Sequence, residues 1–241
     1  MNNPNNTKFT LSYAPEHTKY VFGVRVNRVV ALRNIRNGVM KGTVGGFVAS
    51  EKCLSFHGRS WVADDACVLP GCRVEDDARA SGNALLINEA ILQDKAEAFD
   101  AATVDNSTLA GNATIFGIAR ICRVYAGGSA FICGKANVAG RENEWLQIDP
   151  HAVLRDERPI TSPKQYTVVI GMQGEVITID KRSKLYYIGS WAGYENQYFE
   201  RMKSGLTRDF HSYQKLLREN AALYGNLKPY VMEDSLTKGG L

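Results

Sequence analysis

The sequence is poor in histidine, has no closely spaced cysteine pair and lacks a long apolar run, and each absence removes a class of protein. It has five Cys, an odd number, and no CxxC motif, so we expect reduced, mostly buried thiols. No apolar stretch approaches the ~18 residues that cross a bilayer. The first ten residues lack the apolar centre of a secretion signal. These features favour a cytoplasmic protein with no membrane partner.

The charge of the chain is modest as well. Its 241 residues carry a net charge of +4, and 44% of them are hydrophobic and 22% charged. Such values are typical of a globular protein with a sizeable core. The sequence lacks the dense Lys/Arg clusters that mark nucleic-acid-binding proteins. We therefore expect no nucleic-acid partner.

What the sequence does have is a six-residue repeat. From residue 56 to residue 138, an apolar residue recurs at every sixth position, with two single-residue deletions. A small residue follows four positions later, as in Val62/Ala66 and Val68/Cys72. Two positions after most of the apolar residues stands Gly, Asn, Asp or Pro, which are turn-forming residues. Arg123 is the exception to this last rule.

A period of six predicts a solenoid with three flat faces per turn. A helix repeats at about 3.6 residues and a strand at about 2, so neither explains the pattern alone. With one hexad per face, each turn stacks equivalent residues in three columns. The columns are Phe56, Val74, Leu92, Leu109 and Ala126; Val62, Ala80, Ala98, Ile115 and Ile132; and Val68, Leu86, Val104, Ile121 and Val138. We predict a mainly β protein centred on a parallel β-helix of about five turns.

The pattern resembles the hexapeptide-repeat, left-handed β-helix superfamily, from Phe56 to Val138 and on to Leu154 through an irregular hexad. The stretch 28–68, which contains GTVGGFVASE and WVADDACV, resembles the first part of bacterial and prophage proteins of this superfamily that are often labelled acyltransferases. The resemblance implies a left-handed coil and a homotrimer. It also implies an alternative function, acyl-CoA-dependent O- or N-acyl transfer.

The composition divides the chain into four segments. Residues 1–50 are β-rich and predict an N-terminal cap, which would cover the unpaired strand edges at the end of the solenoid. The β-helix occupies 51–154, and the polar, proline-containing stretch 155–165 predicts a linker. Residues 166–241 predict a small C-terminal α+β domain. We expect its strands at 166–172, 175–180 and 185–194, and its helices at 195–204 and 208–224.

The acyltransferase alternative requires a general base. Enzymes of this superfamily use a His that removes a proton from the acceptor, with acyl-CoA as the cofactor. Only His57 and His151 stand beside the repeats, and no His lies between Arg59 and Pro150. They are the catalytic residues of this alternative; otherwise both are exposed polar side chains. No His pair has the spacing of a zinc site in this fold, so we expect no metal.

The outward positions of the repeat suggest a second kind of site. The basic residues predicted to bind a ligand are Arg73, Arg79, Arg120, Arg123 and Lys135. A strip of such cations would bind an anionic molecule, whereas the neighbouring Glu residues favour a solvated face. The large aromatic residues predicted at subunit interfaces or in the core, with stacking on a ligand as the alternative, are Trp61, Trp145, Trp191 and Tyr194.

Our leading hypothesis from the sequence is a non-catalytic binding or scaffold protein built on a trimeric left-handed β-helix. Its partner is an anionic small molecule or a host protein, and it needs no cofactor. The resemblance to prophage proteins extends this hypothesis to a phage-encoded inhibitor of host defence. The absence of His within the coils counts against the acyltransferase alternative.

Overall fold

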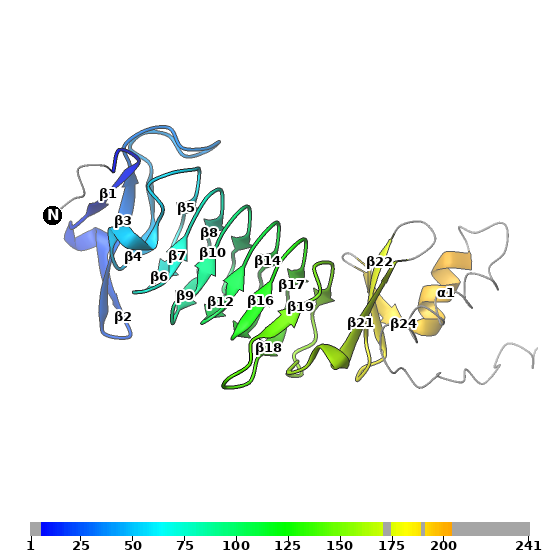
Figure 1. Cartoon of the computed structure of the whole chain (residues 1–241). Helices are drawn as coiled ribbons and strands as arrows, with labels where there is room; N and C mark the ends of the chain where they lie inside the picture. Colours follow the sequence, from blue (N-terminus) through cyan, green and yellow to red (C-terminus); the bar gives the residue numbers. More distant parts are fainter. Residues whose placement is uncertain (1–5, 171–174, 189–190, 204–241) are drawn as a thin grey trace, which may run out of the picture. The chain divides into compact units, whose positions relative to one another are not determined.

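The structure is a computed structural model that describes residues 6–170, 175–188 and 191–203. The chain forms two compact units, Met1–Pro163 and Lys164–Leu241. The first unit is a parallel β-solenoid of about six turns with a β-rich cap over its first turn (Figure 1).

Each turn contributes a short strand or a bridge residue to each of three faces, numbered here in chain order. Face 1 comprises β4 (Val44–Val48), β6 (Cys67–Val68), β9 (Leu85–Ile87), β12 (Thr103–Asp105), β15 (Arg120–Cys122) and β18 (Asn137–Ala139). Face 2 begins with the bridge residue Leu54 and continues with β7 (Arg73–Val74), β10 (Ile91–Leu92), β13 (Thr108–Leu109), β16 (Val124–Ala126) and β19 (Leu146–Ile148). Face 3 comprises β5 (Trp61–Val62), β8 (Arg79–Ala80), β11 (Glu97–Ala98), β14 (Thr114–Ile115), β17 (Phe131–Ile132) and β20 (Val153–Leu154).

The strand registers confirm the six-residue repeat and both deletions. On face 1, Val68 pairs with Leu86 and Leu86 with Val104, at a spacing of 18 residues. Val104 then pairs with Ile121 and Ile121 with Val138, at a spacing of 17. From Val62 to Val138, every residue of the predicted columns is 0% exposed. The core therefore runs along the inside of the solenoid and consists of stacked aliphatic side chains.

The first turn departs from the prediction that Phe56 begins the column of face 2. Leu54 takes that place and is 1% exposed. Phe56 is half-buried, and its ring centroid lies 5.9 Å from that of Phe9. The corner from Leu54 to Val62 is two residues longer than the later corners because its backbone wraps around the buried side chain of Lys8.

The corners of the solenoid use residues that tolerate a positive φ. Asp64, Asp76, Asp94 and Asp100 have φ values between 51° and 58°. The carboxylate of each accepts a hydrogen bond of 2.8–3.1 Å from a backbone N–H of the next turn. Arg123 also adopts a positive φ, of 54°. These four carboxylates are parts of the scaffold and not free acids.

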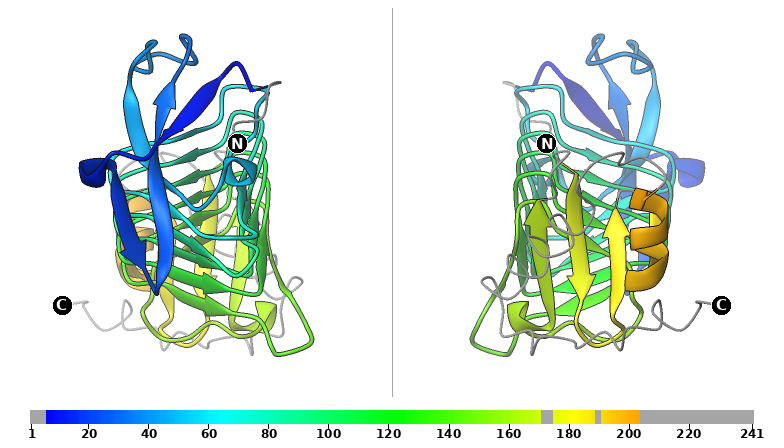
Figure 2. Two further views of the ribbon diagram at one scale, coloured as in Figure 1. Left: turned by 90° about the vertical axis from the view of Figure 1, so that its left-hand side faces the viewer. Right: turned by 90° about the vertical axis from the view of Figure 1, so that its right-hand side faces the viewer.

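The cap is an antiparallel sheet that continues face 1, and Figure 2 (left) shows it from the cap end. It comprises β1 (Phe9–Ser12), β2 (Thr18–Val21) and β3 (Val24–Ala31), with a 3₁₀ turn at Pro15–His17; a second 3₁₀ turn, Glu51–Cys53, lies in the first turn of the solenoid. Strand β4 pairs antiparallel with β3 and parallel with β6, so it joins cap and solenoid. A Cβ at Gly45 would overlap the carbonyl oxygen of Val62, and one at Gly46 would lie 2.7 Å from that of Ala66. The glycine-rich stretch is thus a tightly packed joint.

The last turn contains an inserted loop. Ile148 stands ten positions after Val138, and a small hairpin closed by a bridge between Arg141 and Glu144 leaves the corner between faces 1 and 2. Ile160, in the stretch predicted as a linker, pairs with Val138 and is 1% exposed. The stacking of the solenoid therefore continues into that stretch.

The described part of the second unit is a four-stranded antiparallel sheet followed by a helix. Its elements are β21 (Tyr166–Ile170), β22 (Val176–Asp180), β23 (Leu185–Ile188), β24 (Trp191–Tyr194) and α1 (Glu195–Lys203), after a 3₁₀ turn at Pro163–Gln165. The single strand predicted at 185–194 is two strands, which pair with each other. Tyr198 and Phe199 of α1 belong to a core cluster with Ile177. The helix predicted at 208–224 lies outside the described residues. No helix in the described ranges is long and apolar enough to span a membrane.

Candidate functional site

His57 lies at the corner between faces 2 and 3 of the first turn. Its side chain is exposed, and the imidazole has no hydrogen-bond partner among the described residues. Its backbone is held on both sides, because the N–H donates to Ser55 Oγ (3.2 Å) and the carbonyl accepts from Lys8 Nζ (3.1 Å). A catalytic base is normally oriented by a third group, and the described residues supply none to His57.

His151 lies at the same corner of the last turn. Its side chain is exposed, and its backbone N–H donates to Asp149 Oδ1 at 2.9 Å. Five levels of strand stacking separate it from His57, which at ~4.8 Å per level is roughly 24 Å. A single chain therefore does not bring the two predicted bases together.

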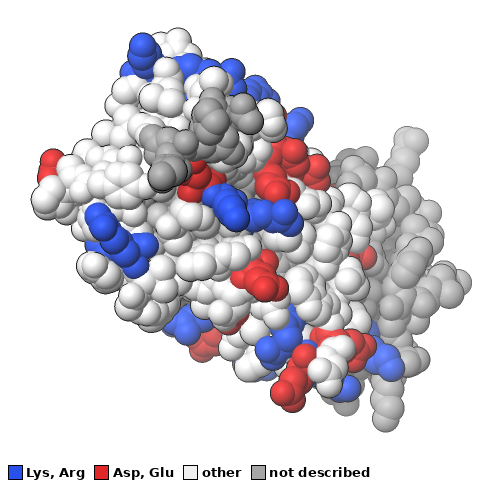
Figure 3. Space-filling model, turned by 60° about the vertical axis from the view of Figure 1, so that its left-hand side comes forward, with Lys and Arg blue, Asp and Glu red and all other residues white. Residues whose placement is uncertain are grey.

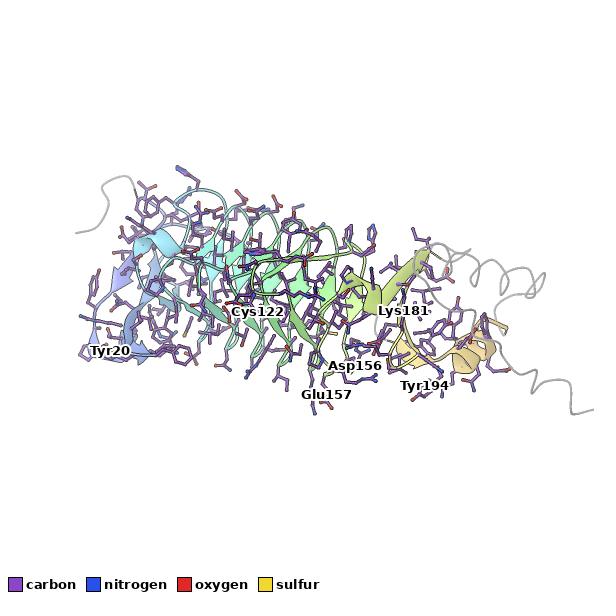
Figure 4. The ribbon with its side chains drawn as sticks, turned by 60° about the horizontal axis from the view of Figure 1, so that its bottom comes forward. Tyr20, Cys122, Asp156, Glu157, Lys181 and Tyr194 are labelled. Atoms are coloured by element: carbon purple, nitrogen blue, oxygen red, sulfur yellow. The ribbon has the colours of Figure 1, made fainter. Side chains whose placement is uncertain are left out.

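The five cations predicted as a ligand-binding strip lie on different sides of the solenoid. Arg73 is on face 2, Arg79 on face 3 and Arg120 on face 1. Lys135 follows face 3, and its ammonium lies 3.5 Å from the carboxylate of Glu157, which Figure 4 labels. Successive hexads point in different directions, so outward residues of neighbouring hexads do not line up. The structure does not bring these residues into one site.

Arg123 holds the inserted loop of residues 140–145. Its backbone carbonyl accepts a hydrogen bond from the N–H of Leu146 at 2.9 Å. Its Nη2 donates to the carbonyl of Gly140 at 3.4 Å. Both ends of the loop thus contact the one corner position where the repeat lacks a turn-forming residue. This contact gives a structural reason for the exception in the sequence.

Of the four aromatic residues predicted at interfaces, two are exposed. Trp61 is 1% exposed and packs under the cap joint, where the absence of a side chain at Gly45 leaves room for its ring. Trp191 is half-buried against the core of the second unit. Trp145 on the inserted loop is 41% exposed, and Tyr194 is 55% exposed. Trp61 is therefore a core residue, while Trp145 and Tyr194 lie at the surfaces of their units.

A row of aromatic side chains on the outside of face 3 was not predicted. The rings of Phe99 and Phe116 stack at 4.9 Å with an angle of 10°, and Phe131 meets Phe116 edge-on at 5.0 Å. All three are half-buried, and the adjoining Ile118 is 56% exposed. We call these three residues the phenylalanine ladder. The sequence contained a signal for it, since Phe99 and Phe116 are 17 residues apart and each directly follows a column residue.

A group of cations at the junction of the cap with the first two turns was also not predicted. We call it the junction cluster, and it consists of Lys8, Arg33, Arg36, Arg59 and Asp77. Lys8 is 0% exposed. Its ammonium donates to the carbonyl oxygens of Ser55 (2.9 Å) and His57 (3.1 Å) and to Ser60 Oγ (2.9 Å). The side chain thus ties the strand edge of the cap to the first turn.

Asp77 connects two members of the junction cluster, Arg36 and Arg59. Arg36 donates from Nη1 to the backbone carbonyl of Asp77 at 3.2 Å. Arg59 binds the Asp77 carboxylate through Nε, at 3.1 Å to both oxygens, and through Nη2. This pair lowers the pKa of the Asp77 carboxyl below its ordinary value, and the charge of Arg36 adds to the effect. The charge of the Asp77 carboxylate is therefore already neutralised by one arginine, Arg59.

The junction cluster carries an excess of positive charge. Burial, followed by the charge of Arg33, lowers the pKa of the Lys8 ammonium to about 8; Arg36 adds to this shift and Asp77 opposes it. Figure 3 shows Lys and Arg side chains gathered along the upper edge of the cap end. The sequence holds a partial signal in LRNIRNGVMKG (32–42), which has three cations and no acid. The proximity of this segment to Lys8 and Asp77 depends on tertiary structure, so the sequence alone did not predict it.

Burial disfavours the reactive form of most of the thiols. All five cysteines are free. Burial raises the pKa of Cys72 to about 11 and also raises the pKa values of Cys67, Cys122 and Cys133. The thiolate is the nucleophilic form of cysteine, so burial makes these four side chains less reactive. The described residues contain no group of three or more His, Cys, Asp or Glu side chains placed to hold a metal ion.

The sequence matches no family model, and no curated protein matches it. The functional argument therefore rests on three features of the first unit. These are the isolated histidines, the phenylalanine ladder and the junction cluster.

Proposed function

We propose that the protein is a non-catalytic binding scaffold whose solenoid is a left-handed β-helix of the hexapeptide-repeat type, assembled as a homotrimer. Its ligand is an anionic small molecule. The phenylalanine ladder is the observation that carries the scaffold proposal, and the junction cluster supports the charge of the ligand.

The ladder supports assembly because it places apolar side chains where a solvated sheet carries polar ones. Phe99, Phe116 and Phe131 are half-buried in the isolated chain, so a partner would remove further apolar surface from water. Arg79 and Glu97 pair side by side on the same face, which gives that face both signs of charge. A second copy of the chain therefore offers complementary apolar and charged groups, and a closed ring of copies leaves no unpartnered surface.

The histidines favour binding over catalysis. A general base must lie within hydrogen-bond reach of the proton that it removes, and His57 and His151 are isolated from each other within one chain. The imidazole of His57 has no orienting partner among the described residues. We therefore expect no acyl transfer from acyl-CoA, and the variants His57→Ala and His151→Ala leave ligand binding unchanged.

Light scattering during size-exclusion chromatography tests the scaffold. We expect the wild-type chain to elute as a trimer and Phe116→Ser to elute mainly as a monomer. Phe22→Ser is the matched control, because Phe22 is 76% exposed at the tip of the β2–β3 hairpin and lies outside the ladder. A wild-type monomer, or a Phe116→Ser variant that remains a trimer, would contradict the proposed assembly. A host protein that co-purifies with the monomer would identify a different occupant of the ladder.

A further inference from the structure

We propose that the junction cluster is a binding site for a phosphate-like oxyanion, with Arg33 and Arg36 as the contacting residues. The proposal rests on the anionic ligand of the proposed function and gives that ligand a place and a chemical group. The group is the phosphate of a small phosphorylated molecule, of which free phosphate is the simplest case.

The charge balance of the cluster favours an anion. Arg36 and Arg59 bind Asp77, and the charges of Arg33 and Arg36 act on the buried Lys8; Asp77 is the one carboxylate that their described contacts include. The nearby carboxylate of Asp76 already accepts the N–H of Asp94 at 3.1 Å. The cluster thus keeps a positive excess that the described part of the chain does not neutralise. A dianion would offset this repulsion.

Lys8 contributes positive electrostatic potential to the site but does not contact the ligand. Its three hydrogen bonds go to the carbonyls of Ser55 and His57 and to Ser60 Oγ, which accounts for every proton of the ammonium. Nothing in this arrangement pairs the buried charge with a carboxylate. A buried, unpaired cation is costly, and an anion held nearby reduces that cost without touching it.

Arg33 and Arg36 are the arginines of the cluster whose guanidinium groups bind no carboxylate among the described residues, whereas Arg59 is held by Asp77. The guanidinium of Arg33 is exposed and has no described partner. Arg36 uses one nitrogen on the Asp77 carbonyl. A guanidinium presents several donors in a planar fork that matches the oxygens of a phosphate. The loop that carries both is ordered by its own bonds, from Ile35 N to Val39 O (3.0 Å) and from Val39 N to Arg36 O (2.9 Å).

The proposal predicts that anion binding is coupled to the proton on Lys8. The titratable and charged groups around this ammonium are Arg33, Arg36, Arg59, Asp77 and the exposed His57. An anion bound beside them favours the protonated form of Lys8 and raises its pKa above the value of about 8 in the free protein. Binding therefore takes up a proton near pH 8.5, and affinity falls as the pH rises further.

Sulfate is the first probe, because its charge stays constant over this pH range. In calorimetric titrations at pH 7.5, we expect saturable binding that Arg33→Gln and Arg36→Gln each weaken by about tenfold or more. Arg120→Gln, an exposed arginine on face 1, is the matched control and should change affinity less than about twofold. Inorganic phosphate and AMP, measured in parallel, distinguish a free anion from a phosphate monoester.

The pH dependence of sulfate binding is measured with the wild-type protein. We expect sulfate affinity to fall by about fivefold or more from pH 7.5 to 9.5, and on the order of half a proton to be taken up at pH 8.5 in buffers of different ionisation enthalpy. In Lys8→Met this uptake should vanish. If Lys8→Met does not fold, the wild-type proton count and the exposed Arg33→Gln variant still decide the question.

Two results would overturn the inference, and they are separable from a failure of the proposed function. Saturable binding that is insensitive to Arg33→Gln and Arg36→Gln would move the anion site elsewhere and leave the scaffold with its anionic ligand. No saturable binding of sulfate, phosphate or AMP would remove the oxyanion site. The trimer measured by light scattering is independent of both results.

Discussion

The middle turns and the first turn of the solenoid follow different rules, although they belong to one stack. From turn 2 to turn 5 a single hexad rule places every inward residue, and the columns are 0% exposed. In turn 1 the column residue is Leu54 and not Phe56, and the corner encloses the side chain of Lys8. Charged residues that the repeat does not require, such as Arg36 and Lys8, are grouped around this turn. The middle turns are built for stacking, whereas the first turn also brings charges together.

The largest effect should come from the regular turns. Ile121 is 0% exposed in the core of turn 5, so Ile121→Ala leaves a cavity that stacked neighbours cannot fill. We expect the free energy of unfolding to fall by about 2–5 kcal/mol. Ile118→Ala is the control, since Ile118 is 56% exposed and should cost less than about 1 kcal/mol. Urea denaturation measures both, and equal losses would mean that the two side chains are not packed as described.

The pH dependence of stability should separate the first turn from the rest. The pKa of Lys8 in the folded chain, about 8, lies below its ordinary value of 10.5. Between these two pH values, a larger fraction of Lys8 is protonated in the unfolded chain than in the folded one. The free energy of unfolding should therefore rise with pH through this window, by up to about 3 kcal/mol. Subtracting the same profile for Lys8→Met removes the contribution of the other groups. A flat difference between pH 8 and 10.5 would contradict the lowered pKa.

The joint between cap and solenoid should be less tolerant than an open glycine position. A Cβ at Gly45 would meet the carbonyl of Val62 and lie 2.7 Å from the ring of Trp61. We expect Gly45→Ala to lower stability by about 1–3 kcal/mol. A Cβ at Gly134 would meet only one atom, at 3.7 Å, but its φ is +64°, so Gly134→Asn is the suitable control. Thermal unfolding in which Gly45→Ala is as stable as the wild type would argue against the tight joint.

The smallest effect concerns the corners. Asp94 has a positive φ of 58° and its carboxylate accepts the N–H of Gly111 at 2.8 Å. Asp94→Ala loses both advantages and should cost about 1–2 kcal/mol. Asp94→Asn keeps the tolerance of positive φ and an acceptor oxygen, so it should cost less than half as much. Equal costs for the two variants would show that the carboxylate charge, and not its geometry, matters at this corner.

The sequence predicts the regular part of the fold because each hexad repeats the same three features: an apolar inward residue, a turn-forming residue and a small residue. Val68, Leu86 and Val104 could be placed in one column from spacing alone, and their registers confirm it. The same spacing misplaced Phe56, since a longer corner is invisible when the next apolar residue happens to fit the period. The run 185–194 was predicted as one strand although Gly189 and Ser190 in its middle are a hairpin signal; Ile188 pairs with Trp191.

The sites were harder to predict than the fold because they combine residues that are distant in sequence. Lys8, Arg36 and Asp77 meet only when the cap docks on the first two turns. The prediction that five cations form one strip was wrong for the opposite reason. Arg73 and Arg79 are close in sequence but lie on different faces of the solenoid. Two members of the phenylalanine ladder could have been found, because Phe99 and Phe116 each directly follow a column residue; Phe131 precedes its column residue and does not share that spacing.

Native mass spectrometry of the protein purified in a volatile buffer, with no phosphate or sulfate added, tests the binding-scaffold account most directly. It reports the number of 26.6 kDa subunits and any small molecule that they retain. The account predicts a trimer that carries an anionic adduct, and an adduct that Arg33→Gln loses while the trimer persists. A bare monomer, for both the wild-type chain and Arg33→Gln, would contradict it.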